Sequence, residues 1–329
     1  MKLKKILSFI ILASMVMASL SACSAPGKKK SDKLKIVTTI FPEYDWVNAV
    51  LGDKAADAEV IMLLDNGVDL HSFQPTAADI ANIADCDVFI YVGGESDGWV
   101  ADALSEATNK DMKVINLLDV LGDKVKEEEV VEGMEGEEEE EEEAGEEEEE
   151  VEYDEHVWLS LRNAQILVRE ISDVLGEADP DNKDTYTKNA DSYIEQLESL
   201  DNDYKIVVDN ATYKTVVFGD RFPFRYLVDD YNLSYYAAFV GCSAETEASF
   251  ETVVFLANKV DELGINNILI IENAKDDIAK TIIENTESKS QNILTINSMQ
   301  GTTSKDVKEG ATYLSIMQDN LDVLNEALN

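Results

Sequence analysis

A long helical pattern without a breaker most limits how this chain can fold. It opens at Pro180 and continues to about Asn210. Apolar residues recur within it at steps of three and four: Tyr186, Ala190, Tyr193, Leu197 and Leu200. Roughly thirty helical residues extend about 45 Å at 1.5 Å per residue, more than the width of a small domain. We therefore predict that residues 179–210 form a rigid helix joining two lobes.

Strand-like and helix-like segments alternate on both sides of this helix. Before it, we expect strands at 34–40, 58–63, 88–92 and 113–117 and helices at 43–51, 76–84, 98–107 and 160–175. After it, we expect strands at 215–218, 235–239, 267–272 and 292–296 and helices at 223–231, 250–263, 276–287 and 314–328. This alternation is typical of parallel sheets covered by helices. The predicted fold is α/β, with two lobes at 34–178 and 211–329, each with a central parallel-type sheet.

The start of the chain predicts its location. Lys2, Lys4 and Lys5 precede an apolar run, residues 6–20, that is too short for a stable membrane span. Leu20-Ser21-Ala22-Cys23 follows and resembles a bacterial lipoprotein signal. We predict a signal peptide over 1–22, lipidation of Cys23 and a tether over 23–33. The protein would then be lipid-anchored at the cell membrane, on its extracytoplasmic face.

Charge is concentrated in one segment. The formal net charge is −41, and residues 127–152 contain the runs Glu137–Glu143 and Glu146–Glu150. Such a segment repels itself and cannot bury apolar surface, so we predict a disordered acidic loop over 124–152. The remainder is also acidic, which argues against nucleic acid or anionic membrane surfaces as partners.

The chain has two histidines, His71 and His156. Imidazole is a common metal ligand because it offers a neutral nitrogen lone pair near neutral pH. Spacing alone favours ordinary histidines, since no short ligand motif joins them. Cys86 precedes an apolar strand and is expected to be buried, whereas Cys242 lies in a Gly-Cys-Ser turn. The sequence does not determine whether these two cysteines form a disulfide, because their distance in the fold is not known from it.

Several ordered motifs make the chain resemble the substrate-binding proteins of zinc and manganese ABC importers. They are His71-Ser-Phe-Gln-Pro-Thr, Asp154-Glu155-His156-Val-Trp-Leu-Ser, Asp179-Pro-Asp-Asn, Ala244-Glu-Thr-Glu-Ala-Ser and Tyr313-Leu-Ser-Ile-Met. The resemblance covers nearly all of residues 34–328. It implies two lobes joined by one rigid helix, with His71 and His156 as metal ligands from the N-terminal lobe. Asp69 or Asp154 would position these rings.

At the position of the family's third metal ligand, this chain differs from the family pattern. Counting back from Tyr226 puts Arg221 at the ligand position, and arginine cannot coordinate a cation. Asp220 is the predicted substitute, with a helix cap as its competing role. Arg221 and Arg225 raise another alternative, pairing with Asp220 or with a bound anion.

At the position of the fourth metal ligand, this chain also differs from the family pattern. The resemblance places an Asp-Ser pair where this chain has Asn297-Ser298, and an amide oxygen adds no negative charge. Glu272 and Glu245 are alternatives, and Cys242 is a further soft donor for zinc.

The resemblance implies capture of zinc and its delivery to an ABC permease, by a protein we expect to be monomeric. Manganese is the alternative metal, and a metal-stapled adhesin or structural lipoprotein is the alternative class. We do not expect an enzyme, because no histidine remains for acid–base work and no phosphate-cradling glycine loop is present. The acidic loop lies where zinc-binding members carry a histidine-rich insertion. It would serve either to collect cations weakly or as a solvated tether.

Overall fold

The computed structural model describes residues 33–136, 152–243 and 247–329. The predicted signal peptide, Cys23, Glu245 and residues 137–151 of the acidic loop lie outside these ranges. Within the described ranges, no helix combines the length and apolar character that crossing a membrane requires.

Four parallel strands form the sheet of the N-terminal lobe, in the order β2-β1-β3-β4. The strands are β1 (Leu34–Thr38), β2 (Ala58–Met62), β3 (Val88–Tyr91) and β4 (Lys113–Asn116). The helices of this lobe are α2 (Phe41–Leu51), α3 (Ala77–Asp85), α4 (Val100–Ser105) and α5 (Leu117–Leu121). Val88, Phe89 and Ile90 of β3 are fully buried. Such a continuous apolar run is typical of a parallel strand covered on both faces.

The second sheet is also parallel, in the order β6-β5-β7-β8. Its strands are β5 (Thr215–Phe222), β6 (Ser234–Val240), β7 (Asn267–Ile271) and β8 (Asn292–Ile296). The accompanying helices are α8 (Arg225–Asp230), α9 (Phe250–Leu263), α10 (Asp277–Asn285) and α11 (Ser304–Lys308). The predicted pair of parallel-sheet lobes is therefore confirmed.

Strand β5 is longer than predicted and irregular. Its pairing register with β6 shifts between Phe218 and Arg221. A bulge of this kind redirects the side chains that follow it. Asp220 and Arg221 consequently belong to the strand itself, and not to the loop after it.

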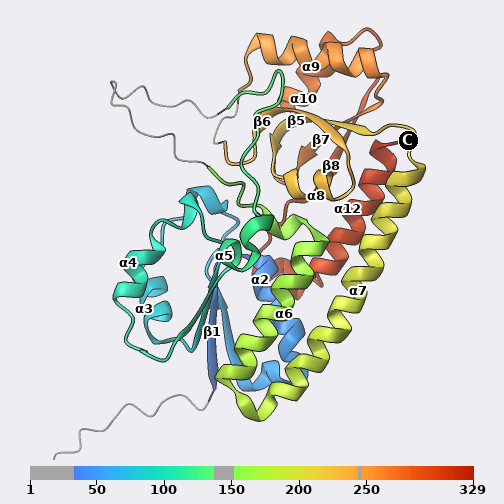
Figure 1. Cartoon of the computed structure of the whole chain (residues 1–329). Coiled ribbons are helices and arrows are strands. Elements are labelled where there is room, and N and C mark those ends of the chain that lie inside the picture. Colours follow the sequence, from blue (N-terminus) through green and yellow to red (C-terminus); the bar gives the residue numbers. More distant parts are fainter. Residues whose placement is uncertain (1–32, 137–151, 244–246) are drawn as a thin grey trace, which may run out of the picture.

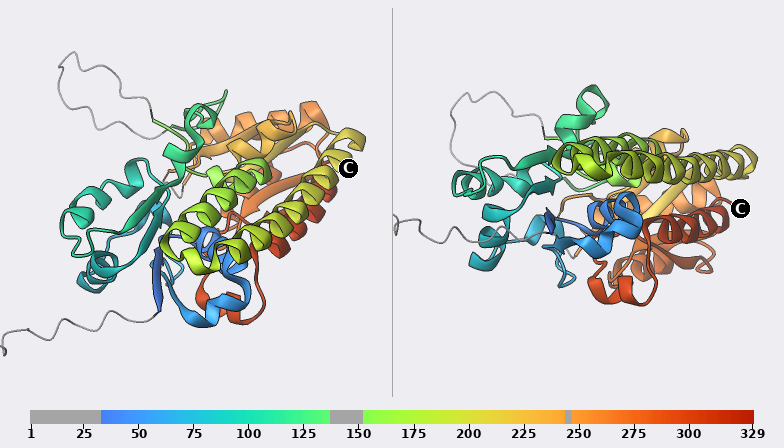
Figure 2. Two further views of the ribbon diagram at one scale, coloured as in Figure 1. Left: turned by 60° about the horizontal axis from the view of Figure 1, so that its bottom comes forward. Right: turned by 90° about the horizontal axis from the view of Figure 1, so that it is seen from below.

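Three long helices run beside one another (Figures 1 and 2): α6 (Leu161–Ala178), α7 (Lys183–Asn210) and α12 (Tyr313–Ala327). The predicted long helix is confirmed as α7, whose 28 residues extend about 42 Å. The Tyr193 hydroxyl donates to Asp45 of α2 at 3.2 Å. Nearer the other end, the Tyr204 hydroxyl donates to the Met317 carbonyl of α12 at 2.6 Å. These two bonds tie α7 to a helix on each side of the lobe junction.

The first part of the predicted acidic loop differs from expectation. The Glu128 amide donates to the Glu152 carbonyl at 3.0 Å, and the Glu135 amide donates to the Ala238 carbonyl of β6 at 2.9 Å. Met134 between them is buried. Residues 126–135 thus pack against the protein, because apolar side chains interrupt the acidic ones and the backbone extends the second sheet.

Candidate metal centre

His71 lies in a single turn, Leu70–Ser72, after strand β2. The Asp69 carboxylate begins this turn by accepting from the His71 amide at 3.0 Å. The ring Nδ1 lies 2.7 Å from the Ser96 hydroxyl and 3.5 Å from Glu155 Oε2. Nδ1 is therefore held by neighbours on both sides, which orients Nε2 toward the junction of the lobes.

His156 is completely buried just before the turn Val157–Leu159. Asp154 Oδ1 accepts from its backbone amide at 2.8 Å and lies 3.0 Å from its ring Nδ1. A carboxylate at Nδ1 fixes the tautomer that leaves Nε2 as the lone-pair donor. A hydrogen-bonding partner on Nδ1 is the usual means by which proteins orient a metal-binding histidine.

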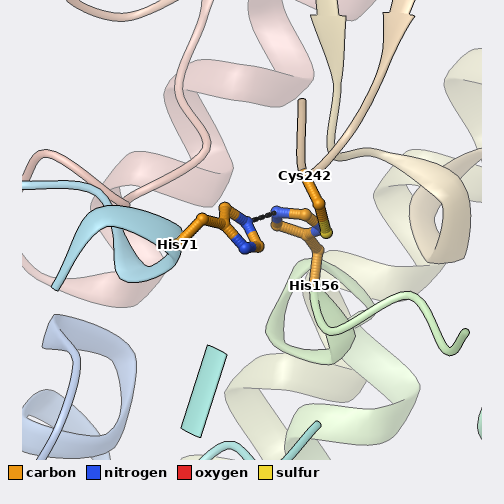
Figure 3. Close-up of side chains that lie close together, drawn as sticks. All are labelled: His71, His156 and Cys242. Atoms are coloured by element: carbon orange, nitrogen blue, oxygen red, sulfur yellow. Dashed lines mark hydrogen bonds between the residues drawn. The ribbon is translucent and has the colours of Figure 1, made fainter. Parts of the chain in front are cut away.

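The two Nε2 atoms face each other at 3.2 Å (Figure 3). Two nitrogens bound about 2.0–2.1 Å from one tetrahedral zinc ion lie about 3.3 Å apart. The rings thus already have the separation that a shared ion needs. His71 and His156, which the sequence separates widely, are brought together as predicted.

A third donor, Cys242, comes from the turn after β6. Among the described residues, one ligand atom each of His71, His156 and Cys242 lie within 4.8 Å of one another (Figure 3). The preceding Gly241 allows this approach, because a Cβ there would lie 2.9 Å from the His156 ring and 3.0 Å from the Phe222 carbonyl. Cys242 was a minor alternative from the sequence, and its position at the end of a strand was the available signal. Cys86 and Cys242 are not joined in a disulfide.

Asp220 does not belong to this group. Its Oδ2 accepts from the Ile271 amide at 3.1 Å and its Oδ1 accepts from the Arg221 amide at 2.8 Å. Burial raises the pKa of the Asp220 carboxyl, although the two amides oppose the shift. The carboxylate links two neighbouring strands and is not among the three clustered donors.

The residues considered as the fourth ligand also form hydrogen bonds with groups outside the centre. Glu272 accepts from the amide and hydroxyl of Ser298 at 2.7 and 2.8 Å. The Asn297 side chain accepts from the Met299 amide at 2.7 Å. Neither joins the group of three donors. Glu245 lies outside the described residues.

The second lobe instead presents Arg221 and Gln300. Arg221 Nη2 lies 2.9 Å from Asp69 Oδ2, an ion pair across the junction, so its partner is Asp69 and not Asp220. With the Gln300 amide oriented to satisfy its neighbours, its nitrogen donates to both Asp69 oxygens at 2.8 and 2.9 Å. Its oxygen then accepts from the Nε2–H of protonated His156 at 3.1 Å. Gln300 was not predicted from the sequence, because it lies outside the motifs that carry the resemblance.

Electrostatics differ between the two rings. Burial, followed by the proximity of His156, lowers the pKa of His71 to about 4. Burial also opposes charge on His156, but Asp154 and its hydrogen bond outweigh burial and raise the pKa of that ring. Burial opposes charge on Asp69 as well, yet His71 and Arg221 lower its pKa. A cation entering this centre therefore competes first with a proton on His156.

Comparison with known proteins agrees with this architecture. A family model described as the periplasmic component A of zinc-uptake complexes, ZnuA, matches residues 36–327. The zinc-binding lipoprotein AdcA of Streptococcus pneumoniae is 35% identical over 322 residues, which are 96% of this chain and 60% of AdcA. The high-affinity zinc uptake system protein ZnuA of Bacillus subtilis is 32% identical over 323 residues, 97% of this chain and 96% of that protein.

A solved structure is also similar. The Zn(II)-bound ZnuA-like domain of Streptococcus pneumoniae AdcA superposes with a TM-score of 0.68 at 32% identity, covering 90% of this chain and 99% of that domain. The chain itself spans about 60% of the length of full AdcA. Because the family model extends across both sheets and the linking helix, the chain belongs to the ZnuA family of zinc-uptake binding components.

Proposed function

We propose that the protein captures one zinc ion outside the membrane and passes it to the permease of an ABC importer. The observation that carries the proposal is the pair of Nε2 atoms 3.2 Å apart, each on a ring whose Nδ1 is already engaged. Relatives named as zinc-binding and zinc-uptake proteins support the same cargo. The named relatives also support membrane attachment through Cys23.

The donor set favours zinc over manganese. Two imidazoles and a thiolate suit a tetrahedral ion of borderline softness, whereas manganese prefers several oxygen ligands. Asp220 and Glu272, the carboxylates predicted as substitute ligands, accept hydrogen bonds from backbone amides instead. Zinc is therefore the proposed cargo, and binding releases the protons of Cys242 and His156 to solvent.

The test is a calorimetric titration of the metal-free protein, combined with X-ray absorption of the loaded protein. We expect one tight zinc site with two nitrogen scatterers and one sulfur scatterer. A carrier also keeps its fold when a chelator removes the metal, whereas a metal-stapled structural protein unfolds. Absence of a tight site, or loss of the fold on chelation, would overturn the proposal.

Cys242→Ser is expected to lower zinc affinity while changing manganese affinity little, because a hydroxyl replaces the soft donor. Competition between the two metals, followed by native mass spectrometry, measures the change in preference. Cys86→Ser is the matched control, since Cys86 lies in the core of the first lobe and lacks contact with the centre. Equal zinc affinity in Cys242→Ser and the parent would remove the thiol from the site.

Asp154→Asn is expected to weaken zinc binding by roughly 10- to 100-fold, the usual cost of losing an outer-shell partner. The change also removes the group that raises the pKa of His156. Proton competition should then begin at lower pH, so the midpoint of the affinity-against-pH curve moves downward. Titrations between pH 5 and 8 check this, and an unmoved midpoint would contradict the role given to Asp154.

A further inference from the structure

A cavity of about 680 Å³ adjoins the proposed metal centre on the side of the second lobe. Asp69, Arg221 and Gln300 form its inner wall. The same three residues border the imidazoles, since Gln300 contacts His156 and Asp69 Oδ1 lies 3.8 Å from His71 Nε2. Pockets for small organic ligands span about 300–1,000 Å³. The space is thus far larger than a bare ion requires.

The lining suits a small molecule with a charged end. Arg221 and Lys275 supply two cations to the lining, and Asp69, Asp220, Glu247, Glu272 and Asp277 supply carboxylates. Val253 and Ile278 add apolar surface. Polar groups in a partly apolar cavity fix the orientation of a bound molecule.

Coordination at the centre is incomplete without a further ligand. His71, His156 and Cys242 are three donors, and tetrahedral zinc takes four. The second lobe contributes Arg221, paired with Asp69 next to His71, and a guanidinium repels a cation but binds carboxylates through a fork of N–H groups. Two of its N–H contacts go to Asp69 and the Ser243 carbonyl, at 2.9 and 3.3 Å. An anion bound between zinc and Arg221 would coordinate the metal and also compensate the positive charge of the guanidinium.

We propose that zinc is bound together with a small carboxylate chelator of the amino-acid or hydroxy-acid class. One donor atom of the chelator completes the coordination of the metal, its carboxylate pairs with Arg221, and its remainder occupies the cavity. Gln300 moves from His156 Nε2 when the metal displaces the Nε2 proton. This inference rests on the proposed zinc site and names the form in which the ion is captured.

Native mass spectrometry of the purified protein tests the proposal, with zinc alone, zinc with L-histidine and zinc with citrate. We expect an adduct of one zinc and one chelator with at least one of the two probes. In parallel titrations at a fixed free-zinc concentration, that probe should raise apparent zinc affinity at least tenfold. Zinc-only adducts, together with an affinity that depends on free zinc alone, would overturn the chelate proposal and leave zinc capture standing. Absence of zinc under every condition would overturn both.

Two variants locate the chelator. Arg221→Leu should abolish the chelator-dependent gain, because the carboxylate loses its partner. Thr281→Trp should also abolish the gain by filling the cavity from α10, far from the donor atoms. Lys205→Leu, which removes an exposed cation from α7, is the matched control and should retain the gain. A full gain in both cavity variants would contradict the assignment.

Discussion

His156→Ala is expected to abolish tight zinc binding. The ring supplies one of three donors, is fully buried and is already oriented by Asp154, so no other side chain can replace it. Loss of an outer-shell partner costs about 10- to 100-fold in metal affinity, and loss of a ligand costs more. His71→Ala should behave alike, because in the proposed site the two Nε2 atoms, 3.2 Å apart, bind the same ion. Competition titration against a chromophoric zinc chelator measures both losses.

Tyr226→Phe is the matched control for these variants. Its hydroxyl donates to the Asp154 carbonyl at 2.7 Å, so the change disturbs the same neighbourhood without removing a donor to the metal. Zinc affinity should stay close to that of the parent. Thermal unfolding in a chelator separates loss of a ligand from loss of the fold. Parental affinity in folded His71→Ala or His156→Ala would place the metal elsewhere.

Raising the pH from 5 to 8 is expected to destabilise the metal-free protein through Glu43. Burial, with the nearby Asp97 adding to it, raises the pKa of this carboxyl from 4.5 to about 8. The unfolded chain therefore loses this proton near pH 4.5 while the folded protein retains it, so stability falls as the pH rises between these values. The loss is on the order of a few kcal/mol, since one pKa unit corresponds to about 1.4 kcal/mol.

Glu43→Gln should remove this part of the pH dependence. The amide mimics the protonated carboxyl, and its oxygen can still accept from the Thr39 amide, now 2.8 Å away. Denaturant unfolding in the presence of a chelator should give similar stability for both proteins at pH 5 and a more stable variant at pH 8. Glu59→Gln, at an exposed position of β2, removes the same charge and should leave the pH dependence unchanged. Parallel pH profiles for Glu43→Gln and the parent would show that the buried carboxyl is already ionised.

Much of the fold was predictable because local patterns and the global arrangement agree. Buried runs such as Val88–Ile90 require covered parallel strands, and the uninterrupted repeat from Tyr186 to Leu200 requires a long helix. The meeting of His71 and His156 was predictable from the family resemblance and from nothing local, since spacing along the chain does not determine proximity across a fold.

The second lobe's part of the centre was less predictable. Its residues depend on the register shift in β5, which turns Asp220 toward the Ile271 amide and leaves Arg221 facing Asp69. A bulge leaves no clear mark in the amino-acid order. Cys242 was underrated for a related reason, because its approach depends on the absence of a side chain at Gly241.

The long helix α7, which links the two lobes, affects how a bound metal ion would be released. Tyr193 and Tyr204 of α7 form hydrogen bonds with α2 and α12, and these contacts limit movement of one lobe against the other. In the proposed delivery, a permease docked on this protein would detect little movement of one lobe against the other. It would recognise the bound ion through the loops around it and would release the ion by displacing those loops, one ligand at a time.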